Sequence, residues 1–272
     1  MVNTCNESPI GVFDSGLGGI SVLAALISNL PEEKYVYFGD SHNAPYGVRE
    51  TEAVKELTFN VVNYLMKYNI KALVVACNTA TSAAVTELRN TYDIPIIGME
   101  PALKPAIEKY KSKDIIVMAT PVTLREKKFN NLIQQFNRPE NIIKLPCPGL
   151  VELIEVSGGE SQEIISYLES LFAPFDLAKV GSIVLGCTHY IFIRDTLKKI
   201  IGNEIELIDG NRGTTNRLHR LLEEKDCRNC NGNETEVRII NSSQDSRMIT
   251  LSKELLEKQL MILNWKGSLK YV

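Results

Sequence analysis

The sequence predicts an α/β protein with two pseudo-symmetric doubly wound domains, whose parallel-rich sheets face each other across a cleft. Short apolar runs alternate with helical patterns along the chain. This alternation is typical of buried parallel strands that are joined by helices. Two of the apolar runs end alike, with a cysteine followed by a small polar residue, at Cys77 and at Cys187. The repeat indicates an internal duplication.

Three strand–helix units make up the first series. Each unit has an apolar run, a polar or glycine-rich turn, and a helical pattern. Strands are expected at residues 10–13, 35–38 and 72–76, and helices at 20–29, 49–67 and 82–90. A short strand near residues 94–98 is bracketed by Pro95, Gly98 and Pro101. Because these residues interrupt the alternation of strands and helices, we predict that the chain passes from the first domain to the second there.

The second series repeats the order of the first. Strands are expected at residues 114–119, 142–145 and 180–185, with helices at 124–136, from 150 onward, and at 161–171. After residue 210 the chain crosses back, with a helix at 212–224, a strand at 237–240 and a helix at 252–263. The predicted domains are therefore residues 1–98 plus 210–272, on the Cys77 side, and residues 99–209, on the Cys187 side.

The composition narrows the class of protein. The 272 residues are 44% hydrophobic and 23% charged, with a net charge of −3, so no basic surface for nucleic acid is expected. No apolar run approaches the roughly 20 residues that span a membrane. The first nine residues lack the apolar core of an export signal. We therefore expect a cytoplasmic protein whose six cysteines are reduced.

The position of Cys77 favours a chemical role. In open α/β sheets, ligands bind outside the carboxyl ends of the strands, where this cysteine lies. Asn78 and Thr79 would cap the next helix, whose dipole favours an anion. We therefore expect the pKa of the Cys77 thiol to lie below the free value of about 8.5. A buried, inert cysteine is the alternative.

Two thiols on opposite faces of one small ligand would fit the inversion of a stereocentre. One group removes a proton from carbon, and the other returns a proton on the opposite face. The turn Asp14–Gly19 partly resembles a dinucleotide-binding glycine motif, but its spacing differs and Asp14 would repel a pyrophosphate. No recognisable motif marks a lysine that would anchor pyridoxal phosphate. The sequence thus predicts a two-base racemase without cofactor or metal.

Four motifs together resemble those of the glutamate racemases, within the wider aspartate/glutamate racemase superfamily. They are F-D-S-G-L-G-G-I at 13–20, G-D-S-H-N-A-P-Y-G at 39–47, A-C-N-T-A-T at 76–81 and G-C-T-H-Y at 186–190. The resemblance covers about residues 8–210. It implies cofactor-independent interconversion of L- and D-glutamate, which supplies D-glutamate for bacterial peptidoglycan.

The resemblance also implies roles for individual residues. Cys77 and Cys187 would be the acid/base pair, with Asp14 assisting Cys77 and His189 assisting Cys187. Glu152 would be a further acidic helper. The residues implied in binding the carboxylates and ammonium of the substrate are Asp14, Ser15, Tyr46, Gly47, Asn78, Thr79, Thr188 and His189.

The C-x-x-C segment Cys227–Cys230 departs from the expected pattern. It is either half of a zinc site, with His219 nearby, or a surface loop with two exposed thiols. Two other functions stay open: a two-lobed binding protein without chemistry, and a thiol redox enzyme that uses this segment. Glutamate is the expected partner. Neither nucleic acid nor a membrane is expected to bind, and the formation of a homodimer stays open.

Overall fold

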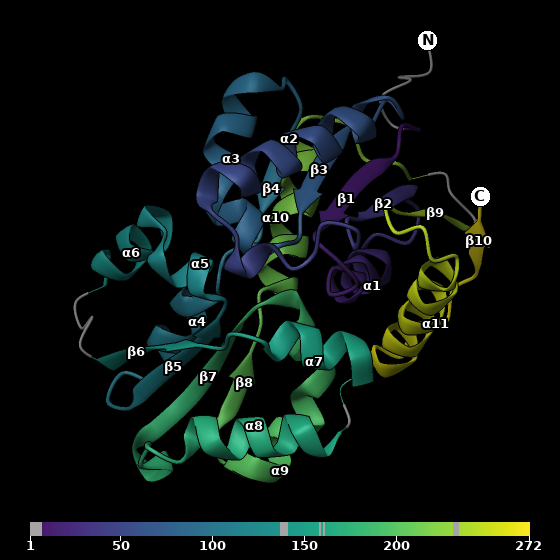
Figure 1. The fold of residues 1–272 in the computed structure, drawn as a ribbon. Coiled ribbons are helices and arrows are strands. Elements are labelled where there is room, and N and C mark those ends of the chain that lie inside the picture. The colour runs from purple at the N-terminus through teal and green to yellow at the C-terminus, as the bar shows by residue number, and fades with distance from the viewer. Residues whose placement is uncertain (1–6, 137–140, 158, 160, 231–233) are drawn as a thin grey trace.

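Two parallel sheets form the frame of the protein. The computed structural model describes residues 7–136, 141–157, 159, 161–230 and 234–272. In Figure 1 the first sheet lies at the upper right and the second at the lower left. The first has the order β10-β9-β2-β1-β3-β4, with β1 (Ile10–Asp14), β2 (Tyr35–Gly39), β3 (Ala72–Val75), β4 (Ile96–Gly98), β9 (Thr235–Asn241) and β10 (Leu269–Tyr271). The second has the order β6-β5-β7-β8, with β5 (Asp114–Ala119), β6 (Ile142–Pro146), β7 (Val180–Gly186) and β8 (Glu206–Ile208).

Helices cover both faces of the first sheet, because alternate residues of its strands point to opposite sides. On one face, Val12 and Val74 pack into a core with α1 (Ile20–Asn29), α10 (Asn211–Glu224) and α11 (Arg247–Ile262). On the other, Phe13 and Val75 pack into a core with α2 (Thr51–Met66) and α3 (Asn78–Thr91). Strands buried on both faces explain the continuous apolar runs in the sequence.

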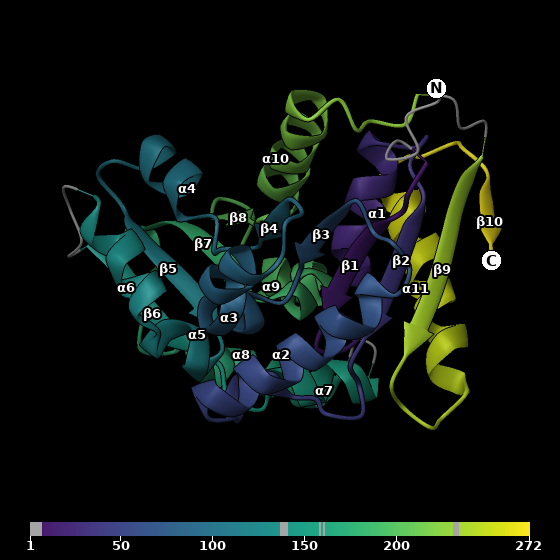
Figure 2. The same cartoon turned by 90° about the horizontal axis from the view of Figure 1, so that it is seen from above.

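The second sheet is covered in the same way. Ile183 points into a core with α7 (Leu150–Ser157), α8 (Gln162–Phe172) and α9 (Arg194–Ile201). Val184 points into the opposite core with α4 (Leu103–Lys109), α5 (Pro121–Arg125) and α6 (Lys127–Gln134). The described residues also form the short 3₁₀ helices η1 (Tyr46–Val48), η3 (Leu177–Lys179) and η4 (Thr188–Ile193). Figure 2 shows both helix-covered sheets from above.

The predicted fold class is confirmed. Four strands of each sheet follow the same spatial pattern, β2-β1-β3-β4 and β6-β5-β7-β8, and the strand pairs of both sheets are parallel. Sheet membership supports the predicted domains, residues 1–98 plus 210–272 and residues 99–209, which we keep as a proposal. Residues 1–6, 137–140, 158, 160 and 231–233, which these ranges include, lie outside the described part of the chain. Among the described residues, no helix combines the length and apolar character needed to cross a membrane.

Some helix boundaries differ from the predictions. α3 begins at Asn78 rather than Ser82, because the Cys77 sulfur itself accepts the Ala80 N–H and caps the helix. The single helix expected at 124–136 is two short helices, since Glu126 adopts an extended conformation between them. α11 starts at Arg247 instead of Ser252, and α4, α9, β8 and β10 were not predicted.

Candidate active site

The carboxyl ends of the two sheets meet at the predicted site residues. Asp14 ends β1, and the glycine-rich turn that follows it lies directly against η4 of the other sheet. The Thr188 hydroxyl donates to Asp14 Oδ1 at 3.3 Å. A Cβ on Gly18 would overlap both Thr188 Oγ1 and His189 Nδ1. The absence of a side chain at this glycine therefore lets the two halves come into contact.

Cys77 lies between β3 and α3 and is 5% exposed. Its thiol donates to Ser15 Oγ at 3.4 Å, and its sulfur accepts the N–H of Ala80 at 3.4 Å. Burial and the negative charge of Asp14 raise the pKa of this thiol to about 12, although both hydrogen bonds oppose the rise. The prediction of a lowered pKa was therefore wrong, because desolvation outweighs the helix terminus. A charge on Cys187 would raise the pKa of Cys77 further.

Cys187 is the first member of a chain of three side chains. Its sulfur lies 3.8 Å from His189 Nδ1, and His189 Nε2 lies 2.8 Å from Glu155 Oε1. Burial alone would lower the pKa of His189, but its hydrogen bonds to Cys187 and Glu155 raise that pKa well above 6.5. Burial likewise opposes ionisation of Glu155, yet the bond and charge of His189 lower the Glu155 pKa. His189 thus lies between the sulfur of Cys187 and the carboxylate of Glu155, an arrangement that favours the charged form of its imidazole.

The structure places Glu155, rather than the predicted Glu152, in contact with His189. Glu152 is exposed on α7, whereas Glu155, about one turn later, contacts His189 and also accepts the N–H of Leu17 at 3.4 Å. The buried face of α7 is formed by Leu150, Val151 and Ile154. At about 100° per residue, Glu155 lies beside this face and Glu152 lies nearly opposite. The apolar pattern of the helix could therefore have identified Glu155 from the sequence.

A group of hydroxyls lies where the first turn of α3, just after Cys77, meets the segment that follows β5. Thr79 Oγ1 is 2.9 Å from Thr120 Oγ1 and 3.3 Å from Thr123 Oγ1. Thr120 and Thr123 follow β5, much as Asp14 and Ser15 lie at the carboxyl end of β1. Our prediction of substrate-binding residues omitted both threonines. Their position at a strand end was the available signal. The remaining predicted binding residues, Ser15, Tyr46, Gly47, Asn78 and Thr188, are also buried.

Asn78 carries an unused hydrogen-bond acceptor. Its Nδ2 donates to the Met99 carbonyl at 3.2 Å, while its buried Oδ1 has no partner among the described residues. A buried polar atom without a partner costs roughly 1–3 kcal/mol. This oxygen is suited to accept a hydrogen bond from a ligand with a cationic donor.

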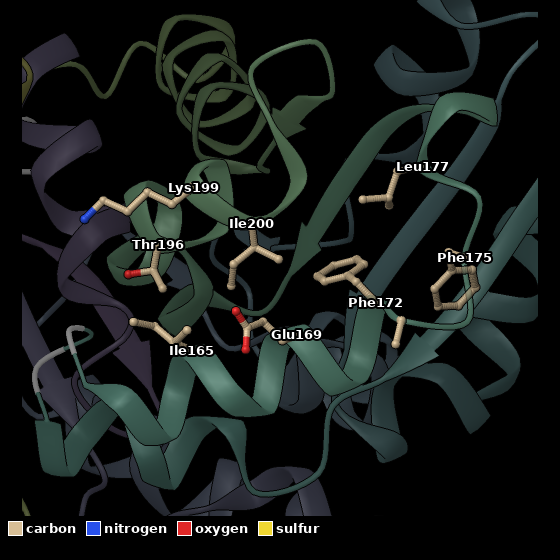
Figure 3. Close-up of a pocket in the computed structure, with 9 residues that line it drawn as sticks. Ile165, Glu169, Phe172, Phe175, Leu177, Thr196, Lys199 and Ile200 are labelled. Carbon is tan, nitrogen blue, oxygen red and sulfur yellow. The ribbon is translucent and has the colours of Figure 1, made fainter.

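Two other features lie apart from these residues. A pocket of about 500 Å³ is formed by α8, η3 and α9, and Figure 3 shows Phe172 and Glu169 rising from α8 toward Ile200 of α9.

The carbonyl of Cys227, in the C-x-x-C segment, accepts from Lys71, which lies next to the amino end of β3, at the edge opposite Cys77. Within the described residues, no group of three or more His, Cys, Asp or Glu side chains is arranged to hold a metal ion.

Comparison with known proteins assigns the family. The family described as Asp/Glu/Hydantoin racemase matches residues 10–218. The chain belongs to this family. It is an enzyme of the isomerase class, and the family resemblance predicted from the motifs is confirmed.

Relatives and solved structures agree with this assignment. The chain is 50% identical over 252 residues to a glutamate racemase of Clostridium novyi, covering 92% of this chain and 97% of the relative. Identity to a Clostridium botulinum (strain Hall) glutamate racemase is 52% over 250 residues, with the same coverage. The structure of glutamate racemase isoform RacE1 from Bacillus anthracis has a TM-score of 0.84 at 28% identity. A Francisella tularensis glutamate racemase in complex with D-glutamate has a TM-score of 0.80 at 25% identity. Each structural match covers 98% of both chains.

The contact between Glu155 and His189 gives a first prediction. Glu155→Gln should lower kcat/KM roughly tenfold, since a hydrogen bond to a charged group contributes about 1.5–3 kcal/mol and water replaces part of it. Glu155 raises the pKa of His189. Its neutralisation should therefore move the alkaline loss of activity to lower pH. Glu152→Gln is the matched control, and a larger loss in that variant would contradict the assignment to Glu155.

Proposed function

We propose that the protein interconverts L- and D-glutamate by proton transfer at Cα between the thiols of Cys77 and Cys187, without a cofactor. The observation that carries the proposal is that two strand-end cysteines from different sheets each adjoin the contact between the Asp14–Gly19 turn and the segment Thr188–His189, each with its own polar partners. Cys77 has Ser15 and Ala80, and Cys187 has His189. The glutamate racemases that share about half of this sequence support glutamate as the substrate.

In this mechanism one cysteine acts as a thiolate base and the other as a thiol acid. The base takes the α-proton from one face, the C–H electron pair stays on the substrate, and the acid adds its proton to the opposite face. By resemblance to the family, Cys77 would deprotonate the D form and Cys187 the L form. The roles of the two groups exchange when the reaction runs backward.

The surrounding groups would prepare this proton transfer. Burial and the charge of Asp14 hold the Cys77 thiol in its protonated form before substrate binds. The ammonium of a bound amino acid would offset the Asp14 charge and favour the thiolate. On the other side, His189 would carry a proton at Nδ1 next to Cys187, and the carboxylate of Glu155 would favour the charged form of this imidazole.

Binding would use groups that are already in place. The unpartnered Oδ1 of Asn78 is suited to the ammonium of the substrate. The hydroxyls of Thr79, Thr120, Thr123 and Thr188 are donors for the carboxylates, and the amino end of α3 adds N–H groups. The expectation of glutamate rather than aspartate rests on the relatives, since one methylene changes binding by only about 1–3 kcal/mol.

The biological setting forms the rest of the proposal. D-glutamate from this reaction would supply bacterial peptidoglycan synthesis. Because both thiols must be reduced to carry protons, the proposal places the enzyme in the cytoplasm, which keeps cysteines reduced. A homodimer also remains part of the proposal.

The reaction should need no added factor. Protein dialysed against a chelator and freed of pyridoxal phosphate should convert pure L-glutamate toward an equal mixture of enantiomers, as followed by chiral chromatography. The same sample should leave L-aspartate much less changed. Activity that appears only after a metal ion or pyridoxal phosphate is restored would contradict the proposal.

Each thiol should be indispensable on its own. Cys77→Ala and Cys187→Ala should each lower racemisation by about 10²–10⁴-fold or more, the usual contribution of a positioned acid or base. Cys230→Ser is the matched control, because this cysteine is exposed in the C-x-x-C segment. If either active-site variant kept most of its activity while Cys230→Ser matched the parent, the two-thiol mechanism would be wrong.

A further inference from the structure

The carboxylate of Asp40, just after β2, is buried and held by neutral donors. Asp40 is 2% exposed. Its oxygens accept from the Tyr46 hydroxyl at 2.6 Å, from the Ser242 hydroxyl at 2.6 Å, and from Asn43 Nδ2 at 3.1 Å to each oxygen. A buried carboxylate is tolerated when hydrogen bonds replace its water, so each donor restricts where Asp40 lies. The position of this carboxylate therefore depends on all three side chains.

Ser242 reaches Asp40 from the far end of the chain. β9 pairs with β2 in parallel, with Asn241 opposite Gly39, so the residues that follow the two strands lie side by side (Figure 1). The Ser242 N–H donates to the Gly39 carbonyl at 3.0 Å, and the His42 N–H donates to Ser242 Oγ at 3.0 Å. The hydroxyl accepts from one side and donates to Asp40 on the other, which fixes its orientation.

Asp40 in turn fixes the turn at Tyr46 and Gly47. Tyr46 is 1% exposed and packs against Phe13, with ring centroids 6.2 Å apart. A Cβ on Gly47 would lie 2.6 Å from Thr120 Cγ2 of the second sheet. The turn is thus held between Asp40 on one side and the side chain of Thr120 on the other. Displacement by about 1 Å is enough to weaken a positioned binding group.

We propose that Ser242 is a positioning residue for substrate binding, which orients the Tyr46–Gly47 turn through the carboxylate of Asp40. The inference rests on the proposed function, since the turn matters in this way only if glutamate binds beside it. It extends the active site to the C-terminal segment, which follows the last residue of the family match at 218. Ser242 touches neither thiol and acts only through Asp40 and the turn.

The decisive variant removes the hydroxyl alone. Ser242→Ala should raise the KM for glutamate about tenfold, the scale of one lost hydrogen bond to a charged group, with kcat changed by less than about threefold. Ser242→Thr keeps the hydroxyl and should restore the parent KM. If Ser242→Ala does not fold, Ser242→Cys, which keeps a weaker donor of similar size, is measured in its place and should show an intermediate KM.

Ser243→Ala is the matched control. The Ser243 hydroxyl accepts the N–H of Asp245 at 3.1 Å inside the same loop, and no bond to residues 39–47 is described for it. This variant should keep the parent KM. Equal KM values in Ser242→Ala and the parent, or equal increases in the two alanine variants, would overturn the inference.

A double-mutant cycle separates positioning from general loosening of the fold. Ser242→Ala and Tyr46→Phe both act on Asp40, so their combined effect on KM should be smaller than the product of the single effects. Independent effects would overturn the inference. Failure of the parent protein to racemise glutamate would instead refute the proposed function, which keeps the two results distinct.

Discussion

The turn from Asp14 to Gly19 packs directly against Thr188 and His189, and the geometry of the whole site depends on this contact. It brings the carboxyl end of β1 onto the carboxyl end of β7. The Thr188 hydroxyl donates to Asp14, and Gly18 has no side chain that would prevent this contact. Glu155 strengthens the same contact by accepting the N–H of Leu17 while bonding His189. Since Cys77 and Cys187 belong to different sheets, this contact sets their separation.

Because that interface excludes water, burial shifts the pKa values of the ionisable groups within it. Asp14 is fully buried, and desolvation raises its pKa and that of the Cys77 thiol. On the Cys187 side, His189 and Glu155 stabilise each other's charged forms despite burial. The two thiols therefore differ in environment although the strands that carry them are pseudo-symmetric. A substrate that brings its own ammonium and carboxylates would complete the charge balance, which favours an amino acid as the ligand.

The position of both cysteines at strand ends could be predicted from the sequence, because parallel strands are continuous apolar runs that end at polar residues. It also predicted Asp14 and His189 through the family resemblance. Contacts between distant segments were not readable in the same way. The raised pKa of Cys77 follows from burial between the two halves, whereas the buried face of α7 could have distinguished Glu155 from Glu152 in the sequence. The bond from Ser242 to Asp40 depends on the pairing of β9 with β2, which connects residues far apart in the chain.

The most direct measurement of the two-thiol mechanism is early-time proton NMR of each glutamate enantiomer in deuterated water. A thiol carries a single proton, unlike a lysine ammonium. A buried thiol can therefore return to the substrate only the proton that it removed, while the opposite thiol delivers a solvent-derived deuteron. The two-thiol mechanism predicts that the first product molecules carry deuterium at Cα and that recovered substrate carries almost none. Deuterium that enters substrate and product at the same rate would contradict it and indicate a single polyprotic base.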